Sequence, residues 1–386
     1  MKHRASLFVC LFASWASTAA AQAKDTGTLW QGTLGAQQIV VEQTGNFAST
    51  SNCGGTYFYR RHRTDIQLDG ERSADGSCRM QELPIRWNRD TPKDQWRMRA
   101  PTEDRWEGEW IGTNGKSHPI RLSKVVTLPD AAEPSLTALR GDFDPYAYLR
   151  LSQLKLQRGK REHVNGYTLR WLRQPESGLS LFEVAAGYAP TQQAAINRTL
   201  HWRLWQWVDS EYQCRAGSEA GEAGFDTAEA TLRHIDARVV SASLFTAYYC
   251  GGAHPDFGDS PVNIDARNGN ELRLEDVLWL GQGDPVHQGE NELDRAWSQY
   301  RQEIFAPWLV RQFAQLYPDR MGAPTVDDDC DYRDPDVWNY TDWYVLPGGI
   351  HLAAYFPRVQ RNCDDPDWAV LPWSLVDAHP GPVRLH

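Results

Sequence analysis

The chain has 386 residues, with 40 lysines and arginines against 50 aspartates and glutamates, and its formal net charge is −10. An acidic chain has no general attraction for nucleic acid or for an anionic membrane surface, so we expect neither as a partner and favour a basic one. A chain of this length predicts two domains.

The first residues have the pattern of a secretory signal. A basic start from Lys2 to Arg4 precedes an apolar run over residues 5–17, which is too short to cross a bilayer as a helix. The letters AQA at residues 21–23 have the spacing that signal peptidase recognises. We therefore predict a signal peptide over residues 1–23, rather than an uncut anchor, and a periplasmic or secreted protein. No later stretch has the length and apolarity of a membrane span.

Six cysteines follow the predicted signal, and export into an oxidising compartment favours disulfides over thiolate metal ligands. They fall as three well-separated couples, and pairing neighbours is the simplest of the possible connectivities. The predicted disulfides are Cys53–Cys78, Cys214–Cys250 and Cys330–Cys363. None of the couples has the CxxC spacing of a zinc ribbon or a redox motif, and we predict no cofactor.

Residues 24–127 have the pattern of an all-β domain. Tyr57 and Tyr59 alternate with Phe58, and the turn signals Asp75-Gly76 and Asn114-Gly115 separate short strands. No long helical period interrupts them, which predicts a small antiparallel barrel or sandwich. The 17 tryptophans of the chain could form a sugar-stacking surface, but packing inside the core is the favoured use.

Residues 128–155 predict a linker and a short helix, and residues 156–386 predict an α+β domain. In that domain we expect helices to pack on one face of an antiparallel sheet. An apolar repeat every four residues predicts a helix from Thr191. A second helical pattern, over residues 287–317, contains Pro307, which should break or kink it.

The strands of this domain are marked by β-branched and aromatic residues. Residues 237–250 predict one long strand. Asn268 and Gly269 are expected to supply the two positive φ angles of a tight turn in a hairpin over residues 262–278. A last hairpin should turn at residues 347–349.

Four motifs occur in an order that resembles the C-terminal extracytoplasmic domain of the RsiV anti-sigma factor, also found beside the catalytic domain of the deacetylase PdaC. They are YYCGGAHP at residues 248–255, the Asn-Gly hairpin at 262–278, WYVLPGGIHLAAYFP at 343–357 and AVLPWSLV at 369–376, within about residues 160–378. Because RsiV binds lysozyme through this domain, the resemblance implies an RsiV-like fold and a binding module of the cell envelope. PdaC takes its catalysis from another domain, whose motifs this sequence lacks.

His254 is the first candidate for chemistry, because imidazole titrates near neutral pH. No histidine or cysteine stands beside it at ligand spacing, and Cys250 is expected to be oxidised. Gly251 and Gly252 can supply a positive φ or a close backbone approach, which favours a structural turn. The alternative is a general base paired with Asp265.

Three further carboxylates have structural interpretations. Asp265 is expected to pair with Arg267 or Arg273, while Asp276 fits a helix cap or first-turn acid and Glu275 is its neighbour. For all three the structural interpretation is favoured over acid–base chemistry.

The acidic segment DDDCDYRDPD at residues 327–336 has the oxygen density of a calcium site. Its candidate ligands are Asp327, Asp329 and Asp331. It lacks the glycine and the closing glutamate of an EF-hand loop, so a solvated loop held by Cys330 is favoured over a metal site.

Together these patterns favour an exported binding protein of the bacterial cell envelope that engages a basic protein such as lysozyme or a peptidoglycan fragment. One alternative is a cell-wall hydrolase that uses His254 with Asp265 or another carboxylate. Another is a structural scaffold that bridges partners. The sequence has no GxSxG, HExxH or phosphate-binding glycine loop, which weighs against an enzyme.

Overall fold

The computed structural model describes residues 27–44, 52–83, 93–217, 223–289, 295–324 and 330–386. The predicted signal peptide lies outside these residues. Among the described residues, no helix is both long enough and apolar enough to cross a membrane.

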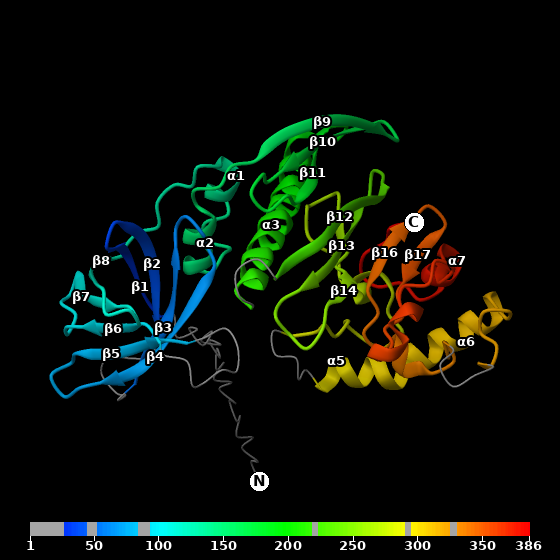
Figure 1. Cartoon of the computed structure of the whole chain (residues 1–386). Coiled ribbons are helices and arrows are strands. Elements are labelled where there is room, and N and C mark those ends of the chain that lie inside the picture. Colours follow the sequence, from blue (N-terminus) through cyan, green and yellow to red (C-terminus); the bar gives the residue numbers. More distant parts are fainter. Residues whose placement is uncertain (1–26, 45–51, 84–92, 218–222, 290–294, 325–329) are drawn as a thin grey trace, which may run out of the picture.

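The N-terminal domain is a closed barrel of eight antiparallel strands (Figure 1). Each strand pairs with the next, and β1 also pairs with β8, so no sheet edge is left open. This decides between the predicted barrel and sandwich. The strands are β1 Thr28–Leu34, β2 Gln37–Thr44, β3 Asn52–Tyr59, β4 Asp65–Arg72, β5 Cys78–Glu82, β6 Gln95–Met98, β7 Arg105–Ile111 and β8 Ser117–Lys124.

Side chains fill the interior of the barrel. The alternation along each strand turns every second residue inward, and Trp30, Tyr57, Trp96 and Trp106 form its bulky centre. Three donors converge on one oxygen, Oε1 of Glu82: the Tyr57 hydroxyl at 2.6 Å and the indole N–H groups of Trp96 at 3.1 Å and Trp110 at 2.9 Å. These tryptophans therefore pack the barrel, as predicted.

Two short helices, α1 Pro134–Thr137 and α2 Pro145–Leu151, connect the barrel to the rest of the chain. Helix α2 lies against the outside of the barrel, where its Tyr146 and Leu149 pack on Val40 and Phe58. The predicted linker therefore makes a firm contact with the first domain.

A buried arginine ties three elements together at this contact. The guanidinium of Arg150 donates to Asp65 of the barrel at 2.6 Å and to Asp209 of the long helix α3 (Pro190–Arg215) at 2.6 Å. Only 2 % of the Arg150 side chain is exposed. The carboxylate of Asp65 also accepts from the Tyr146 hydroxyl at 3.0 Å. The barrel, α2 and α3 are thus joined by one ionic network.

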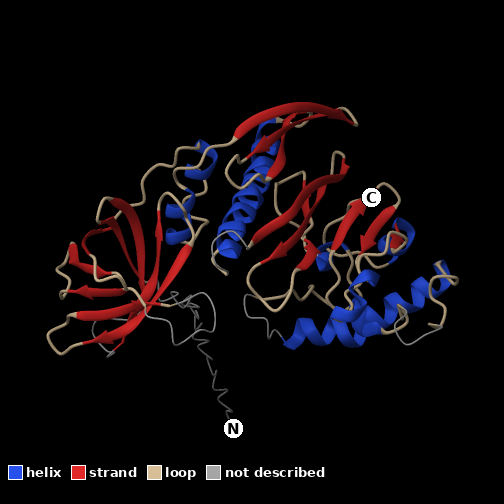
Figure 2. Ribbon diagram, viewed as in Figure 1, coloured by secondary structure: helices blue, strands red, loops and turns tan. Residues whose placement is uncertain are grey.

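The C-terminal part is α+β, with three antiparallel sheets, of which the central one lies between α3 and the β16–β18 sheet (Figure 2). Its strands are β9 Gln157–Val164, β10 Tyr167–Arg173, β11 Ser180–Ala186, β12 Gly224–Ile235, β13 Val239–Tyr249, β14 Asp256–Asp259, β15 Val262–Asp265, β16 Trp343–Leu346, β17 Gly349–Leu352 and β18 Val370–Pro372. Its other helical segments are α4 Leu274–Val277, α5 Arg295–Tyr300, η1 Arg301–Phe305, α6 Ala306–Leu316, η2 Pro335–Trp338, η3 Arg358–Cys363 and α7 Trp373–Ala378.

The central sheet, β12 to β15, is covered on both faces. Residues 240, 242 and 244 of β13 join the apolar core under α3, whereas Ser241 points to the opposite face. There its hydroxyl donates to Asn263 at 2.6 Å and accepts from the backbone of Val345 in β16 at 3.0 Å. A helix therefore covers one face of the sheet, and a second sheet covers the other through a buried polar network.

The helix that contains Pro307 does not end there. Segments α5, η1 and α6 form one continuous helical run from residue 295 to residue 316. The turn before the proline is a π-helix, in which the Ala306 N–H reaches back five residues to the carbonyl of Arg301. The helix therefore does not break at Pro307 but changes its hydrogen-bond pattern, because a wider turn accommodates a residue that has no N–H to donate.

Candidate functional site

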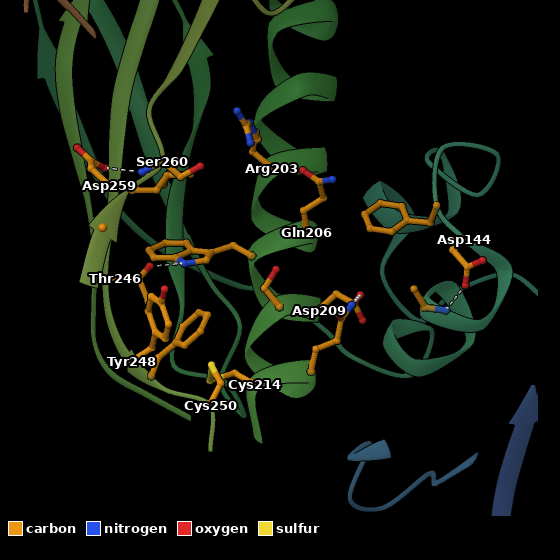
Figure 3. A pocket seen from close by; sticks show the side chains of 18 of the residues that line it. Asp144, Arg203, Gln206, Asp209, Cys214, Thr246, Tyr248, Cys250, Asp259 and Ser260 are labelled. Carbon is orange, nitrogen blue, oxygen red and sulfur yellow. Dashed lines mark hydrogen bonds between the residues drawn. A yellow bond between two sulfur atoms is a disulfide. The ribbon is translucent and has the colours of Figure 1, made fainter. Parts of the chain in front are cut away.

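A cleft of about 830 Å³ lies between α3, the strands β13 and β14, and the loop before α2 (Figure 3). Helix α3 presents Arg203, Gln206, Trp207, Ser210 and Cys214 to it. These positions recur at intervals of three and four residues, so they share one face of the helix. The cleft therefore follows directly from the helical periodicity of α3.

Aromatic rings form part of the cleft lining. Trp207 of α3 and Tyr248 of β13 line it together with Phe225 of β12 and Phe143 of the loop. The Trp207 indole donates to Thr246 at 2.9 Å, and the ring centres of Phe225 and Tyr248 are 6.3 Å apart. Trp207 is only 8 % exposed and anchors this wall, whereas the partly exposed rings of Phe143, Phe225 and Tyr248 offer apolar faces on which a ligand can stack.

Two polar side chains of the cleft have no partner. Within the described parts of the chain, the amide of Gln206 and the hydroxyl of Ser210 make no hydrogen bond. They stand four residues apart on α3, and both line the cleft. Figure 3 labels Gln206. An amide and a hydroxyl can each donate and accept, which suits a neutral polar ligand.

Most charges of the cleft are already paired within the protein. The Asp144 carboxylate caps α2 by accepting from two backbone N–H groups. Half-buried Asp259, on β14, has a pKa raised mainly by burial. The wall is therefore acidic, but its carboxylates are largely engaged. The ion pairs are Asp142 with Arg198, Asp209 with Arg150, and Arg203 with Glu271.

The disulfides join neighbouring cysteines, as the sequence predicts. Cys53–Cys78 links β3 to β5 in the barrel, and Cys330–Cys363 links two segments near the C-terminus. Cys214–Cys250 ties the last turn of α3 to the end of β13 and lines one end of the cleft (Figure 3). It therefore fixes the spacing between the two walls.

The YYCGGAHP segment forms the turn between β13 and β14. Gly251 has a φ of +83°, and a Cβ there would meet the carbonyl oxygen of Gly217 at 1.6 Å, so both its conformation and its surroundings require glycine. Gly252 has neither requirement, since a Cβ there would lie 4.0 Å from the nearest atom, the His254 carbonyl oxygen. His254 is exposed, and its Nδ1 lies 3.2 Å from the Pro255 carbonyl and next to Arg358.

His254 and Asp265 are not brought together. Tyr248 pairs with Asp256, two residues after His254, whereas Val239 pairs with Asp265 at the other end of β13. At about 3.3 Å per residue these positions are roughly 30 Å apart. The hydrolase that would combine the two side chains is therefore not supported by the fold.

Asp265 instead has a structural partner. It accepts from Arg267 Nε at 2.8 Å and Nη2 at 2.7 Å. Burial raises the pKa of the Asp265 carboxyl, but the hydrogen bonds from Arg267 outweigh burial and hold the pKa below its ordinary value. This is the pairing with Arg267 that the sequence offered, and Arg273 takes no part in it.

The turn at Asn268 and Gly269 differs from the expected one. Gly269 has a φ of +79°, but Asn268 does not have a positive φ. A Cβ on Gly269 would meet the backbone of Ala195 at 2.4 Å, and the Thr199 hydroxyl donates to its carbonyl at 2.6 Å. Close packing against α3, rather than a tight two-residue turn, therefore sets the role of this glycine.

The acids after this turn are structural as well. The Asp276 carboxylate accepts from the backbone of Arg273 at the start of α4 and lies 2.8 Å from His287. Glu275 is buried and accepts from Trp297 at 2.8 Å and from Arg301 at 2.6 Å. Arg273 is the N-cap, so Asp276 is the first-turn acid of the two predicted alternatives, and both carboxylates of this pair have partners.

The candidate calcium ligands are only partly within the described residues. Asp327 and Asp329 lie outside them. Asp331 accepts from Arg333 Nε at 2.8 Å. Among the residues described, no three His, Cys, Asp or Glu side chains group in a way that could hold a metal ion.

Gln206 and Ser210 are site residues that the sequence did not predict. Their only signal is that both are polar and stand four residues apart, on a helix that carries many other polar residues. The apolar positions of that helix define its buried face, and only some of its polar positions line the cleft. Nothing local distinguishes such polar positions from an ordinary solvated face.

A scan against protein-family models gives no match, and no curated protein matches the chain in sequence. The resemblance to the RsiV domain therefore stays a prediction.

Proposed function

We propose that this chain is an exported binding protein of the cell envelope that takes a peptidoglycan-type glycan in the cleft beside α3. The observation that carries the proposal is the unpartnered pair Gln206 and Ser210 beside fixed aromatic rings. Sugars combine hydroxyl and amide groups with apolar ring faces, so they need this mixture of contacts. The volume of about 830 Å³ lies in the range of small-molecule sites.

The three disulfides fit an extracellular or otherwise oxidising compartment. The RsiV resemblance is consistent with the same location. A glycan of the cell wall is therefore a ligand that such a protein would meet.

A second candidate ligand is a basic protein such as lysozyme, favoured by the formal net charge of −10. Electrostatic attraction would speed its association and would be screened by salt.

The test is calorimetry of the exported chain with a tetramer of N-acetylglucosamine. We expect binding that the double variant Gln206→Ala/Ser210→Ala weakens by about 2 kcal/mol, or roughly thirtyfold, because two hydrogen bonds are lost. Gln192→Ala removes the same amide from the far end of α3, outside the cleft, and should leave affinity unchanged. Equal effects of both changes, or no glycan binding by the unmodified chain, would contradict the proposal.

A parallel titration with hen lysozyme at low and physiological salt tests the second candidate. Binding that weakens with salt and survives the double variant would support a basic partner. If neither ligand binds, the result favours the hypothesis of a structural scaffold.

A further inference from the structure

A second hollow, about 240 Å³ in volume, adjoins the cleft at β14, where Gly258 and Asp259 line both. Phe245, Tyr340 and Tyr355 line it, with 37 %, 55 % and 56 % of their surfaces exposed. Only seven large hydrophobic side chains of the described residues are exposed, and three of them meet here. Such a concentration of exposed rings in one concave place indicates a binding surface.

Carboxylates share this hollow with the rings. Asp259, Asp342 and Asp365 line it and come from β14, the start of β16 and the loop after η3. The Asp342 carboxylate is accessible and makes no hydrogen bond or ion pair with any residue that the structure describes. Burial among protein atoms, followed by the charges of Asp259 and Asp365, raises the pKa of Asp342 to about 7.

A buried histidine next to the cluster does not neutralise it. His351 is 1 % exposed and stacks on Tyr344 with ring centres 4.4 Å apart. Its Nε2 lies 2.9 Å from the Pro366 carbonyl, while its Nδ1 faces Asp365 at 3.5 Å and has no hydrogen-bond partner. Burial lowers the pKa of His351. His351 therefore supplies no full counterion to Asp365.

The chain itself shows what this mixture of groups accommodates. In the other half of the hollow, the guanidinium of Arg361 lies 4.9 Å from the Phe257 ring centre and 4.7 Å from that of Tyr355. It also pairs with Asp364 at 2.8 Å and Asp256 at 3.3 Å. Rings and carboxylates thus already hold one cation by cation–π and ionic contacts.

The half around Asp342 has the same combination of rings and carboxylates, but no described residue forms an ion pair with Asp342. The two arginines whose charges act on it, Arg301 and Arg203, form their ion pairs with Glu275 and Glu271 instead. We propose that it binds the cationic head of a lysine or arginine side chain from a protein partner, between Tyr340 and Asp342. A hollow of 240 Å³ admits one long side chain and no larger element. This site adjoins the α3 cleft, with which it shares Asp259, but Tyr340 and Asp342 do not line the cleft and its occupation does not depend on a glycan.

The test uses the exported chain at pH 8 and a trilysine peptide with blocked ends, against the same peptide with norleucine in place of lysine. We expect the trilysine peptide to bind and the norleucine peptide to fail, because only the ammonium group differs. Asp342→Asn and Tyr340→Ala should each weaken trilysine binding by about tenfold or more. Asp319→Asn, at an exposed acid that does not line the hollow, should leave it unchanged.

Three results would overturn the proposal: no trilysine binding, equal losses in Asp342→Asn and Asp319→Asn, or free spermidine binding as tightly as the peptide. The last would assign the hollow to a small amine instead of a protein. Thermal unfolding of each variant separates lost binding from lost folding. The double variant Gln206→Ala/Ser210→Ala should keep full trilysine affinity, so a failure of the glycan proposal is distinguishable.

Discussion

Two carboxylates that lie among aromatic rings, Glu82 and Asp342, differ in their hydrogen bonding. In the barrel, Glu82 accepts three hydrogen bonds on one oxygen, from Tyr57, Trp96 and Trp110. In the hollow of the second domain, Asp342 has rings nearby and no hydrogen-bond partner among the described residues. The hydrogen-bonded carboxylate of Glu82 stabilises the fold, whereas the charge of Asp342 is repelled by Asp259 and Asp365 and has no ion-pair partner of its own among the described residues.

The largest change in the free energy of unfolding is expected when Arg150, which pairs with two carboxylates, is replaced. Arg150→Met leaves Asp65 and Asp209 buried without their shared cation, so the free energy of unfolding should fall by about 3–5 kcal/mol. Urea denaturation measures it. The control is Arg238→Met, an exposed arginine, which should change stability by less than about 0.5 kcal/mol. A loss of similar size in both variants would show that the Arg150 network does not join the domains.

A smaller loss is expected in the barrel. Glu82→Leu removes the acceptor of three donors, two of them on fully buried side chains, and should cost about 3 kcal/mol in the same assay. Glu103→Leu, at an exposed acid of the same domain, is the matched change. If Glu82→Leu left the free energy of unfolding unchanged, the hydrogen bonds to Glu82 would not stabilise the fold, and the proposed difference from Asp342 would be wrong.

Asp342→Asn should raise the stability of the protein at neutral and higher pH, whereas the two changes above lower it. The pKa of this carboxyl is 3.8 in the unfolded reference and about 7 in the folded chain. Between these pH values the folded state binds a proton that the unfolded state lacks, so stability falls as the pH rises from about 4 to 7 and stays reduced above 7. The charged groups that act on this pKa are Asp259, Asp365, Arg301 and Arg203.

The melting temperature of Asp342→Asn should therefore exceed that of the unmodified chain at pH 8, and the difference should vanish near pH 4. Asp319→Asn should show no such pH dependence. A stabilisation of equal size at both pH values would exclude the carboxyl charge as its cause.

The smallest effect concerns binding at the hollow. Trilysine affinity should rise severalfold between pH 6 and pH 8, because deprotonated Asp342 attracts the ammonium group. Asp342→Asn should flatten this rise. An affinity that does not change with pH would place the peptide elsewhere on the acidic surface.

Local patterns predicted much of the fold. The alternation around Phe58 and the Asn114-Gly115 turn specify antiparallel hairpins, because side-chain period and turn geometry depend on adjacent residues. The long strand at residues 239–249 and the helix at residues 190–215 follow from the same local preferences. Neighbour pairing of the cysteines was also correct, since each couple lies on elements that meet.

Local patterns did not predict features that depend on contacts with residues distant in the chain. Asn268 and Gly269 have the letters of a tight turn, but contact with Ala195 sets its shape. His254 stood out by its motif, yet it lies on an exposed turn. Asp342 drew no notice, because nothing in its own segment shows that Asp259 lies beside it.

The sequence by itself determined the all-β first domain, the α+β second domain and the pairing of the disulfides, because strand alternation, helical periodicity and cysteine spacing act over short stretches. Only the tertiary structure decided which polar groups are satisfied. Hydrogen bonds and Coulomb interactions act through space, so Glu82 found three donors, while Gln206, Ser210 and Asp342 were left facing open hollows.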